Sequence, residues 1–299
     1  MTRPAIAALV VLILGLLVVS GWWQPQAPVV PDRQPFITQR PNLNLEANAH
    51  RGGGLYAPEN TLASIEAAIS RGAKSVELDV RYTAEGVPVL MHDATVDRTT
   101  NGEGPIENYT LFELQALDAG SWFSAEYADT RVPTLEQALE VVQGRACVYW
   151  DAKVPPTMRA VELFQQYGYG FEPGCLVIRT YDEWTNMLHL LWPDAPLIRM
   201  AKDPALLEEM VSDYPWLAAV RVQSNRLDTA LVDRAHALGL RVFVRAANID
   251  DDPAGESGDD QSILFNSVAA SGADVITLDN LDAFNTWQAG SLSAEPARR

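Results

Sequence analysis

The sequence predicts an α/β fold, and within that class a (β/α)8 TIM barrel preceded by one N-terminal transmembrane helix. Short apolar runs rich in Val, Ile and Leu alternate with helical stretches, which is typical of a parallel sheet with crossover helices. Open doubly wound sheets share this pattern, so it favours the barrel without excluding an open sheet. Eight such runs occur, at residues 46–50, 74–80, 146–153, 175–181, 196–201, 218–223, 240–246 and 274–280.

The stretches between these runs carry helix signals. In the first of them Leu62, Ile65 and Ile69 share one face, and Gly72 follows as a stop signal. Three stretches end on glycine in this way, at residues 61–72, 134–144 and 228–239.

One further strand-like run, residues 87–93, follows the second strand too closely for a parallel crossover, which needs about a dozen residues. We therefore expect a β-hairpin excursion after the second strand. A turn centred on Glu85 and Gly86 places His92 opposite Asp79, whereas a bulged turn shifts the pairing by one residue.

Residues 4–23 carry no charge and are long enough to cross a hydrocarbon core of about 30 Å. Arg3 precedes this segment and the next basic residue is Arg33, so the positive-inside bias places the N-terminus in the cytoplasm. A cleaved signal peptide is the alternative, and the bulky Trp22 and Trp23 argue against it. We expect a single-pass protein of the inner or plasma membrane with its barrel outside the cytoplasm, in the periplasm of a Gram-negative cell.

Composition sets the remaining limits on domains and partners. With 22 basic and 39 acidic residues, the net charge of −17 argues against nucleic-acid binding, and no motif indicates a protein partner. Five prolines mark an extended linker after the membrane segment. The expected units are a membrane anchor at 1–23, a Pro-rich linker at 24–44, a catalytic barrel at 45–288 and a flexible tail at 289–299.

Acidic side chains gather at the predicted strand ends. Glu77 and Asp79 are two residues apart in an apolar strand and therefore share a face, as do Asp151 and Lys153 in the next barrel strand. In a barrel such groups converge at the C-terminal mouth. Three carboxylates without a cysteine or histidine cluster favour a hard divalent cation, Ca²⁺ or Mg²⁺, over zinc.

Basic side chains complete a predicted phosphate site. His50 and His92 can serve as general base and general acid near neutral pH. Arg51 and Lys153, together with a cation, can bind a phosphate and stabilise the charge that develops at phosphorus. Glycines 52–54 are expected to let the backbone approach a ligand closely.

These stretches resemble the glycerophosphodiester phosphodiesterases of the phospholipase C-like phosphodiesterase superfamily. The matching segments include "HRGGGLYAPENTLAS", "GAKSVELDVRYTAEGVPVLMHDATVDRTTNGEG", "DAK" and "GADVITLDN", and they span nearly all of residues 47–282 in order. The resemblance implies metal-dependent hydrolysis of a glycerophosphodiester to glycerol 3-phosphate and an alcohol. In the family's usual account the glycerol 2-hydroxyl attacks phosphorus, and water then opens the cyclic phosphate.

The resemblance also implies a role for each matching residue. Two histidines share the acid–base work, three acids hold the metal, a basic pair contacts the phosphate, and two polar residues support the first loop. In that order these are His50 and His92; Glu77, Asp79 and Asp151; Arg51 and Lys153; Glu59 and Asn60.

Two departures from the family pattern affect the expected substrate and metal. Asp151 stands where the family usually has Glu, and residues 245–248 read "RAAN" where the family usually has Trp-Thr-Val-Asn. Arg245 is joined by Arg179 and Arg199 near other strand ends. Some of these arginines are predicted to line the mouth and favour a substrate with extra negative charge, of the glycerophosphoinositol or glycerophosphoglycerol type. The alternative is that they pair with loop carboxylates on the outside.

The sequence leaves open the state of its cysteines and the exact activity of the barrel. The two cysteines, Cys147 and Cys175, lie on neighbouring predicted strands and could form a disulfide, whereas barrel stagger would favour two free thiols. A phospholipase-type enzyme acting on lysophospholipids at the membrane is a rival function. A non-catalytic binding barrel is another.

Overall fold

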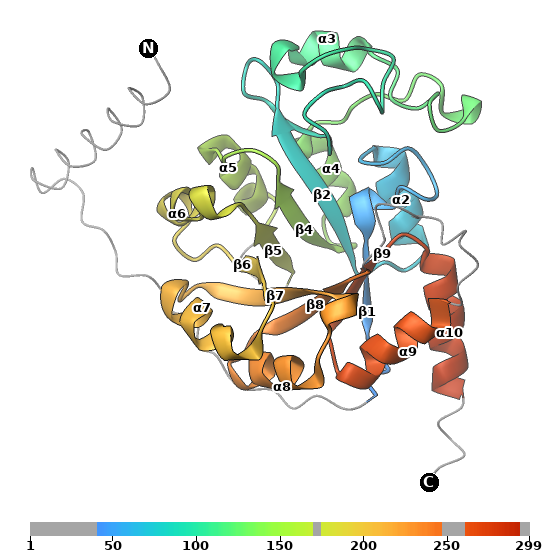
Figure 1. Cartoon of the computed structure of the whole chain (residues 1–299). Helices are drawn as coiled ribbons and strands as arrows, with labels where there is room; N and C mark the ends of the chain where they lie inside the picture. Colours follow the sequence, from blue (N-terminus) through green and yellow to red (C-terminus); the bar gives the residue numbers. More distant parts are fainter. Residues whose placement is uncertain (1–40, 170–174, 247–260, 294–299) are drawn as a thin grey trace, which may run out of the picture.

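Eight parallel strands close into a barrel in the computed structural model, which describes residues 41–169, 175–246 and 261–293 (Figure 1). The strands follow one another around the barrel in chain order, and β1 pairs with both β9 and β2, which closes the sheet. The (β/α)8 prediction is thereby confirmed. The strands are β1 (Glu46–Ala49), β2 (Ser75–Tyr82), β4 (Cys147–Ala152), β5 (Leu176–Arg179), β6 (Leu197–Met200), β7 (Leu217–Gln223), β8 (Arg241–Arg245) and β9 (Val275–Leu278).

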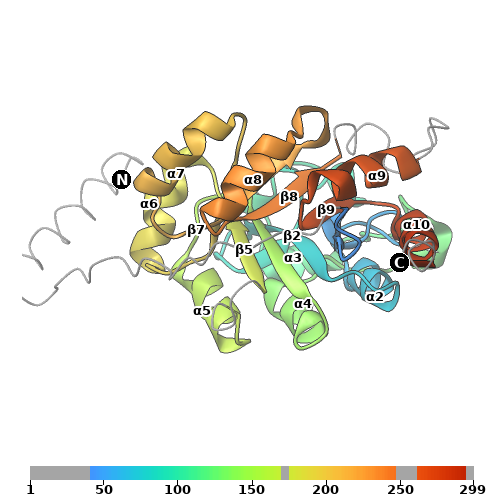
Figure 2. The same cartoon turned by 90° about the horizontal axis from the view of Figure 1, so that it is seen from below.

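Helices surround the barrel on all sides, as the two views show (Figures 1 and 2). They are α2 (Leu62–Ser70), α4 (Leu135–Val142), α5 (Met158–Gln166), α6 (Asp182–Leu191), α7 (Leu207–Asp213), α8 (Thr229–Ala237), α9 (Gln261–Ser271) and α10 (Leu281–Ser293). Thr61 and Thr134 begin α2 and α4 with reciprocal capping boxes, which satisfy backbone N–H groups that the helix itself leaves unpaired. Helix α10 continues to Ser293, although the tail was expected from residue 289.

Strand side chains alternate between two apolar layers. Outward-facing residues such as Leu78 and Trp150 pack against the helices, and Trp150 stacks on Phe164 of α5 with ring centroids 4.6 Å apart. Inward-facing residues fill the barrel with a separate apolar plug, formed by Tyr149, Val177, Ile198, Ala219, Phe243 and Val275. The polar mouth described below lies on the C-terminal side of this plug.

The predicted hairpin excursion is present, but its register differs from the expected one. Strand β3 (Pro88–Leu90) runs antiparallel to β2 and pairs Leu90 with Val80. The N–H of Met91 donates to the Asp79 carbonyl at 2.9 Å, so Met91 and not His92 lies opposite Asp79. The physical reason is a three-residue loop with Gly86 at a φ of 78°, which moves the pairing by one residue relative to a two-residue turn.

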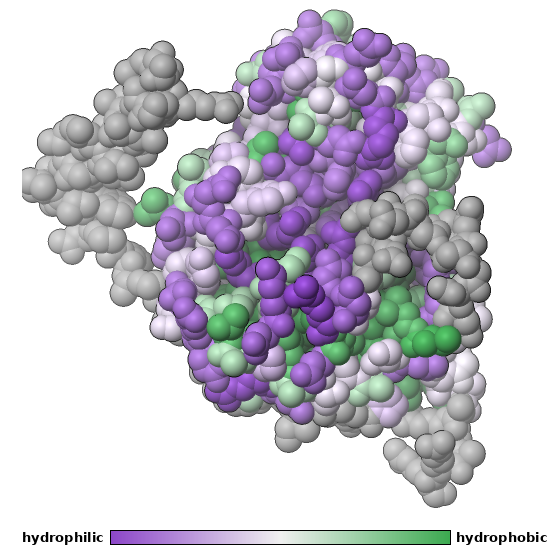
Figure 3. Space-filling model, in the orientation of Figure 1, coloured by the Kyte–Doolittle hydropathy of each residue, from purple (hydrophilic) through white to green (hydrophobic). Residues whose placement is uncertain are grey.

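The excursion continues beyond β3 as a small unit above the barrel, drawn at the top of Figure 1. It contains α3 (Leu111–Ala116) and short 3-10 turns at Ile106–Asn108 and Ala125–Tyr127. Its own apolar cluster includes Val96, Ile106 and Leu114. Mostly hydrophilic residues cover it on the face shown in Figure 3.

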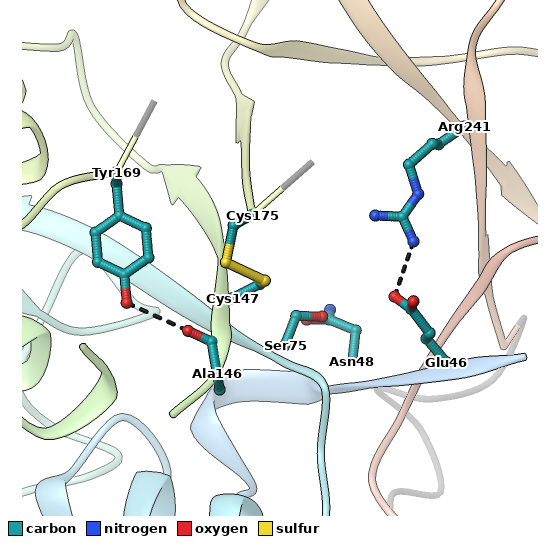
Figure 4. The surroundings of a disulfide bond; sticks show 8 residues. All are labelled: Glu46, Asn48, Ser75, Ala146, Cys147, Tyr169, Cys175 and Arg241. Atoms are coloured by element: carbon teal, nitrogen blue, oxygen red, sulfur yellow. Dashed lines mark hydrogen bonds and ion pairs between the residues drawn. A yellow bond between two sulfur atoms is a disulfide. The ribbon is translucent and has the colours of Figure 1, made fainter. Parts of the chain in front are cut away.

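A disulfide joins Cys147 and Cys175 at the N-terminal end of the barrel, with the Cα atoms 4.5 Å apart (Figure 4). The free-thiol alternative favoured by barrel stagger is wrong, because β4 and β5 pair Val148 with Leu176 and so leave the two cysteines side by side. Nearby, Arg241 Nη2 donates to Glu46 Oε2 at 2.8 Å inside the same end of the barrel.

Within the ranges that the structure describes, no helix is long and apolar enough to cross a membrane. The predicted span at residues 4–23 lies outside those ranges, as does the predicted linker up to residue 40. The last linker residues pack on the barrel, since Asn42 donates through its backbone N–H to the Ala269 carbonyl and through Nδ2 to the Ala273 carbonyl, both at 2.8 Å.

Candidate active site

Three buried carboxylates meet at the C-terminal end of the barrel. Glu77 and Asp79 extend inward from β2, and Asp151 extends from the partner position on β4. Each has one oxygen within 4.8 Å of the others, and the three residues are 3%, 1% and 1% exposed. Buried carboxylates this close repel one another, so the cluster requires positive charge nearby.

Two cations of the chain supply part of that charge. Lys153 Nζ lies 2.7 Å from Asp151 Oδ2 and 3.1 Å from Asp79 Oδ1, and Arg179 Nη1 lies 2.5 Å from Asp151 Oδ2. Burial opposes the charge of Lys153, but Asp79 and Asp151 outweigh it and raise the pKa of the ammonium. Burial likewise opposes ionisation of Asp79, while Lys153 and His92 hold its pKa well below the usual value.

The same carboxylates fit a divalent cation. Asp151 Oδ1 is buried and has no hydrogen-bond partner among the described residues, although an ionised oxygen in such a place normally has one. Asp79 Oδ1 likewise accepts no hydrogen bond from the described part of the chain, and its contact is the ion pair with Lys153. An all-oxygen donor set from Glu77, Asp79 and Asp151 suits Ca²⁺ or Mg²⁺.

His50 is held at the end of β1 by a carboxylate from the last strand. Its Nδ1 lies 3.1 Å from Asp279 Oδ1, and its Nε2 lies 3.8 Å from Glu77 Oε2 and 3.5 Å from Arg245 Nη2. An arginine can only donate, so the neutral His50 accepts at Nε2 and donates from Nδ1 to Asp279. Burial disfavours the imidazolium, but Asp279 and Glu77 outweigh it and raise the pKa of His50.

His92 repeats this arrangement in the segment that follows β3. Its Nδ1 lies 2.7 Å from Asp93 Oδ1, and its Nε2 lies 3.4 Å from Arg51 Nη2. Burial raises the pKa of Asp93, but Arg98 and His92 overcome it and bring the pKa to about 2. Both imidazoles therefore present Nε2 to the mouth and hold Nδ1 against a carboxylate.

The first loop is fixed by polar contacts. Arg51 donates to Glu59 at 3.2 Å, and Arg98 donates to the same carboxylate at 2.7 and 2.8 Å. Asn60 donates through Nδ2 to Asp79 at 2.7 Å and accepts from the Asp79 backbone N–H at 3.2 Å. Arg51 and Asn60 adopt positive φ values of 47° and 54°, which these contacts stabilise.

Gly52 and Gly53 pack closely against α2. A Cβ on Gly52 would lie 3.1 Å from Ile65, and a Cβ on Gly53 would lie 2.9 Å from Ala68. Both residues also have positive φ. The loop therefore needs glycine to pack against α2, and the close approach to a ligand stays a prediction.

All ten predicted site residues lie in this one cluster. Two of the three predicted arginines, Arg179 and Arg245, face the mouth. The third, Arg199, lies on the outside and pairs with Asp182 and Thr185 of α6. Sequence reasoning missed the partners of the two histidines and of the first loop, which are Asp279, Asp93 and Arg98. Asp93 follows His92 directly and could have been found; Asp279 could not, because its role depends on which strand closes beside β1.

Comparison with known proteins decides the family. The model of the Glycerophosphoryl diester phosphodiesterase family matches residues 50–282. This chain belongs to that family. The predicted resemblance is confirmed, and the matched range contains every residue of the cluster described above.

Individual family members agree with this assignment. A putative glycerophosphodiester phosphodiesterase of Bacillus subtilis is 30% identical over 209 residues, which cover 67% of this chain and 85% of that protein. Glycerophosphodiester phosphodiesterase 1 of Mus musculus is 41% identical over 141 residues, or 46% of this chain. This chain spans only 43% of the length of the mouse relative.

Two solved structures show the same barrel. A glycerophosphodiester phosphodiesterase from Agrobacterium tumefaciens is 29% identical, with a TM-score of 0.70 over 81% of this chain and 99% of that one. A phosphodiesterase from Oleispira antarctica, solved with the product sn-glycerol-3-phosphate, is 28% identical, with a TM-score of 0.68 over 80% of this chain and 95% of that one.

Proposed function

We propose that the protein hydrolyses glycerophosphodiesters to glycerol 3-phosphate and an alcohol, with a divalent cation as cofactor. One observation carries the proposal. Two imidazoles, each oriented by its own carboxylate, face the same buried cluster of three acids at the C-terminal mouth of the barrel. Membership of the phosphodiesterase family and the product bound to the Oleispira relative support the same reaction.

The two histidines provide the proton transfers. One imidazole takes the proton of the glycerol 2-hydroxyl as that oxygen bonds to phosphorus, and the other gives a proton to the alcohol oxygen as its bond to phosphorus breaks. Water then opens the cyclic phosphate by the same transfers in reverse. His50 Nε2 and His92 Nε2 are the atoms available for these steps, because Nδ1 of each is directed to a carboxylate.

The charged residues bind and stabilise the phosphodiester. Arg51 Nη2 lies 3.4 Å from His92 Nε2, Lys153 Nζ lies 3.1 Å from Asp79 Oδ1, and both residues carry the donors that a phosphate requires. Glu77, Asp79 and Asp151 would hold a Ca²⁺ or Mg²⁺ ion, which when bound neutralises the acids and stabilises charge on the phosphate oxygens.

The test uses the full-length protein in detergent. After treatment with a chelator, Ca²⁺ or Mg²⁺ is added back and glycerol 3-phosphate release is measured from glycerophosphocholine, glycerophosphoglycerol and glycerophosphoinositol. Release that depends on the metal and falls about 10²- to 10⁴-fold in His92→Ala supports the proposal. No release from any diester would favour a non-catalytic barrel, and release of phosphate products from lysophosphatidylcholine alone would favour the phospholipase-type enzyme.

We further propose that residues 4–23 anchor the protein in the inner or plasma membrane, with the barrel on the extracytoplasmic side. The support is the uncharged apolar run and the placement of Arg3 before it. Membrane fractionation followed by proteolysis of intact spheroplasts tests both parts. Barrel fragments should appear without lysis, and a barrel protected until lysis would place it in the cytoplasm.

A further inference from the structure

Charged residues occupy one level of the barrel interior, directly above the apolar plug. On four strands the inward residue of the plug is followed two positions later by a charged residue that faces the mouth. The pairs are Tyr149 and Asp151, Val177 and Arg179, Ala219 and Arg221, and Phe243 and Arg245. Arg221 of β7 and Arg245 of β8 therefore lie across the mouth from the acids of β2 and β4, whereas Arg179 of β5 lies beside Asp151.

Arg221 differs from the other two arginines. Arg179 donates to Asp151, and Arg245 contacts His50. Arg221 is 6% exposed, and none of the described residues forms a hydrogen bond or ion pair with its guanidinium. Burying an unpaired charge is costly, so the position is suited to binding an anion.

Two neutral groups near Arg221 also have unused hydrogen-bonding capacity. The Tyr149 hydroxyl and Gln223 Oε1 are buried without a partner among the described residues. Gln223 lies two residues after Arg221 on the same face of β7 and pairs with Arg245 across the sheet. Burial raises the pKa of the Tyr149 hydroxyl to about 12, and the positive charge of Arg221 acts on the same hydroxyl in the opposite direction. A protonated hydroxyl is a donor for an anion.

The position of β7 separates Arg221 and Gln223 from the scissile phosphate. In the closed order of eight strands, β7 is four strands from β2 in both directions and therefore lies across the barrel from Glu77 and Asp79. The phosphodiester is bound beside the acids by Arg51 and Lys153, as proposed above. An anion at Arg221 must then belong to another part of the substrate.

We propose that Arg221, with the Tyr149 hydroxyl and Gln223, forms a subsite for a second anionic group, a phosphate or carboxylate on the alcohol part of the glycerophosphodiester. The inference rests on the proposed function and narrows its substrate class. Arg221 supplies a paired set of N–H donors that suits a phosphate or a carboxylate, and the apolar plug beneath it excludes water. Arg221 is then a residue that sets specificity and takes no part in the proton transfers.

The test compares glycerophosphoinositol with glycerophosphoinositol 4-phosphate, which differ by one phosphate. The wild-type protein should show a kcat/KM about 10- to 100-fold higher for the phosphorylated diester, mainly through KM. Arg221→Gln should abolish this preference while its kcat/KM for glycerophosphoinositol changes less than about threefold. Arg221→Lys should restore part of the preference. The control is Arg199→Gln, which removes an arginine of the adjacent strand that faces α6 and should leave the preference intact.

A measurement of thermal stability distinguishes a role of Arg221 in specificity from a role in holding the fold. Removing a buried charge that has no partner among the described residues should leave the Tm of Arg221→Gln equal to or above that of the wild type. A preference that survives in Arg221→Gln, or an equal loss of kcat/KM on both diesters, would overturn the subsite. If the wild-type protein hydrolyses neither diester, the proposed function fails separately. Calorimetric binding of the two diesters then decides the subsite, with tighter binding of the phosphorylated one expected only in the presence of Arg221.

Discussion

Each imidazole of the site is oriented by a carboxylate, and the two carboxylates come from unrelated parts of the chain. Asp93 is adjacent to His92, whereas Asp279 reaches His50 from the end of β9. A carboxylate on Nδ1 fixes the tautomer and directs Nε2 to the mouth, where it would exchange a proton with the substrate under the proposed mechanism. The role proposed for His50 therefore depends on closure of the barrel between β1 and β9.

Replacing Asp279 with asparagine should lower kcat by about 10²-fold, because the amide can present its NH2 to Nδ1 and favour the wrong tautomer of His50. Steady-state kinetics with glycerophosphocholine measures the effect. The matched control is Asp274→Asn, which alters a second His–Asp pair, His236 Nε2 to Asp274 Oδ2 at 2.9 Å, away from the mouth. It should lower Tm and leave kcat within about twofold. Equal losses of kcat in both variants would contradict the orienting role.

Asp151→Asn should raise the metal concentration needed for half-maximal activity by more than about tenfold, since even outer partners of metal ligands contribute that much. The carboxylate is 1% exposed and has one oxygen without a hydrogen bond from the described residues. Titration of the chelated protein with Ca²⁺ or Mg²⁺ gives the value. Glu46→Gln is the control, because Glu46 faces the interior at the opposite end of the barrel and pairs with Arg241. An unchanged metal requirement in Asp151→Asn would remove Asp151 from the proposed ligands.

Residues at strand ends could be predicted because a two-residue period in an apolar strand fixes which side chains share a face. That reasoning placed Glu77, Asp79 and Asp151 together, as the structure does. It could not identify Arg221, because a lone arginine in an apolar run is equally compatible with the outer face. Arg199 shows the difficulty, since it has the same sequence context and lies outside.

At the level of elements, the excursion after β2 brings His92 to the mouth. Its existence followed from the short spacing between the two runs, but its register depended on a three-residue loop that the alternation of residues cannot reveal. A single side chain then ties this excursion to the first loop. Arg98 donates to Asp93 at 2.6 Å and to Glu59 at 2.7 and 2.8 Å.

Arg98→Gln should therefore loosen the segment that carries His92. Arg98 is 43% exposed, so its ion pairs contribute less than about 1 kcal/mol to stability, and we expect little change in Tm. Hydrogen exchange of residues 91–104 should become faster, and kcat should fall about three- to tenfold through poorer positioning. Arg131→Gln is the control, because Arg131 is equally exposed in the same excursion but pairs with Asp129. Equal changes in hydrogen exchange and kcat in the two variants would refute a specific role of Arg98 in holding the excursion against the first loop.

On the scale of the whole molecule, the apolar plug divides the barrel interior into an N-terminal end and the C-terminal mouth that holds the candidate site. The apolar plug separates the disulfide and the Glu46–Arg241 pair from the carboxylates and histidines of the mouth. The alternation of strands and helices favoured this barrel, because eight apolar runs match its number of strands, although open sheets share the pattern. The disulfide depended on the register of β4 and β5, which pairs Val148 with Leu176 and is not specified by the sequence alone.

This division predicts that stability and activity can be separated. Replacing both Cys147 and Cys175 with serine removes a cross-link over a sequence separation of 28 residues, which should lower the free energy of unfolding by about 3 kcal/mol. Activity at 25 °C should stay within about twofold of the wild type, because Cys147 lies four residues below Asp151 on β4, on the far side of the plug. Denaturant unfolding and glycerol 3-phosphate release measure the two effects. A reductant should lower the Tm of the wild type to that of the double variant and leave the variant unchanged. Two free thiols in the denatured, unreduced protein would contradict the disulfide itself.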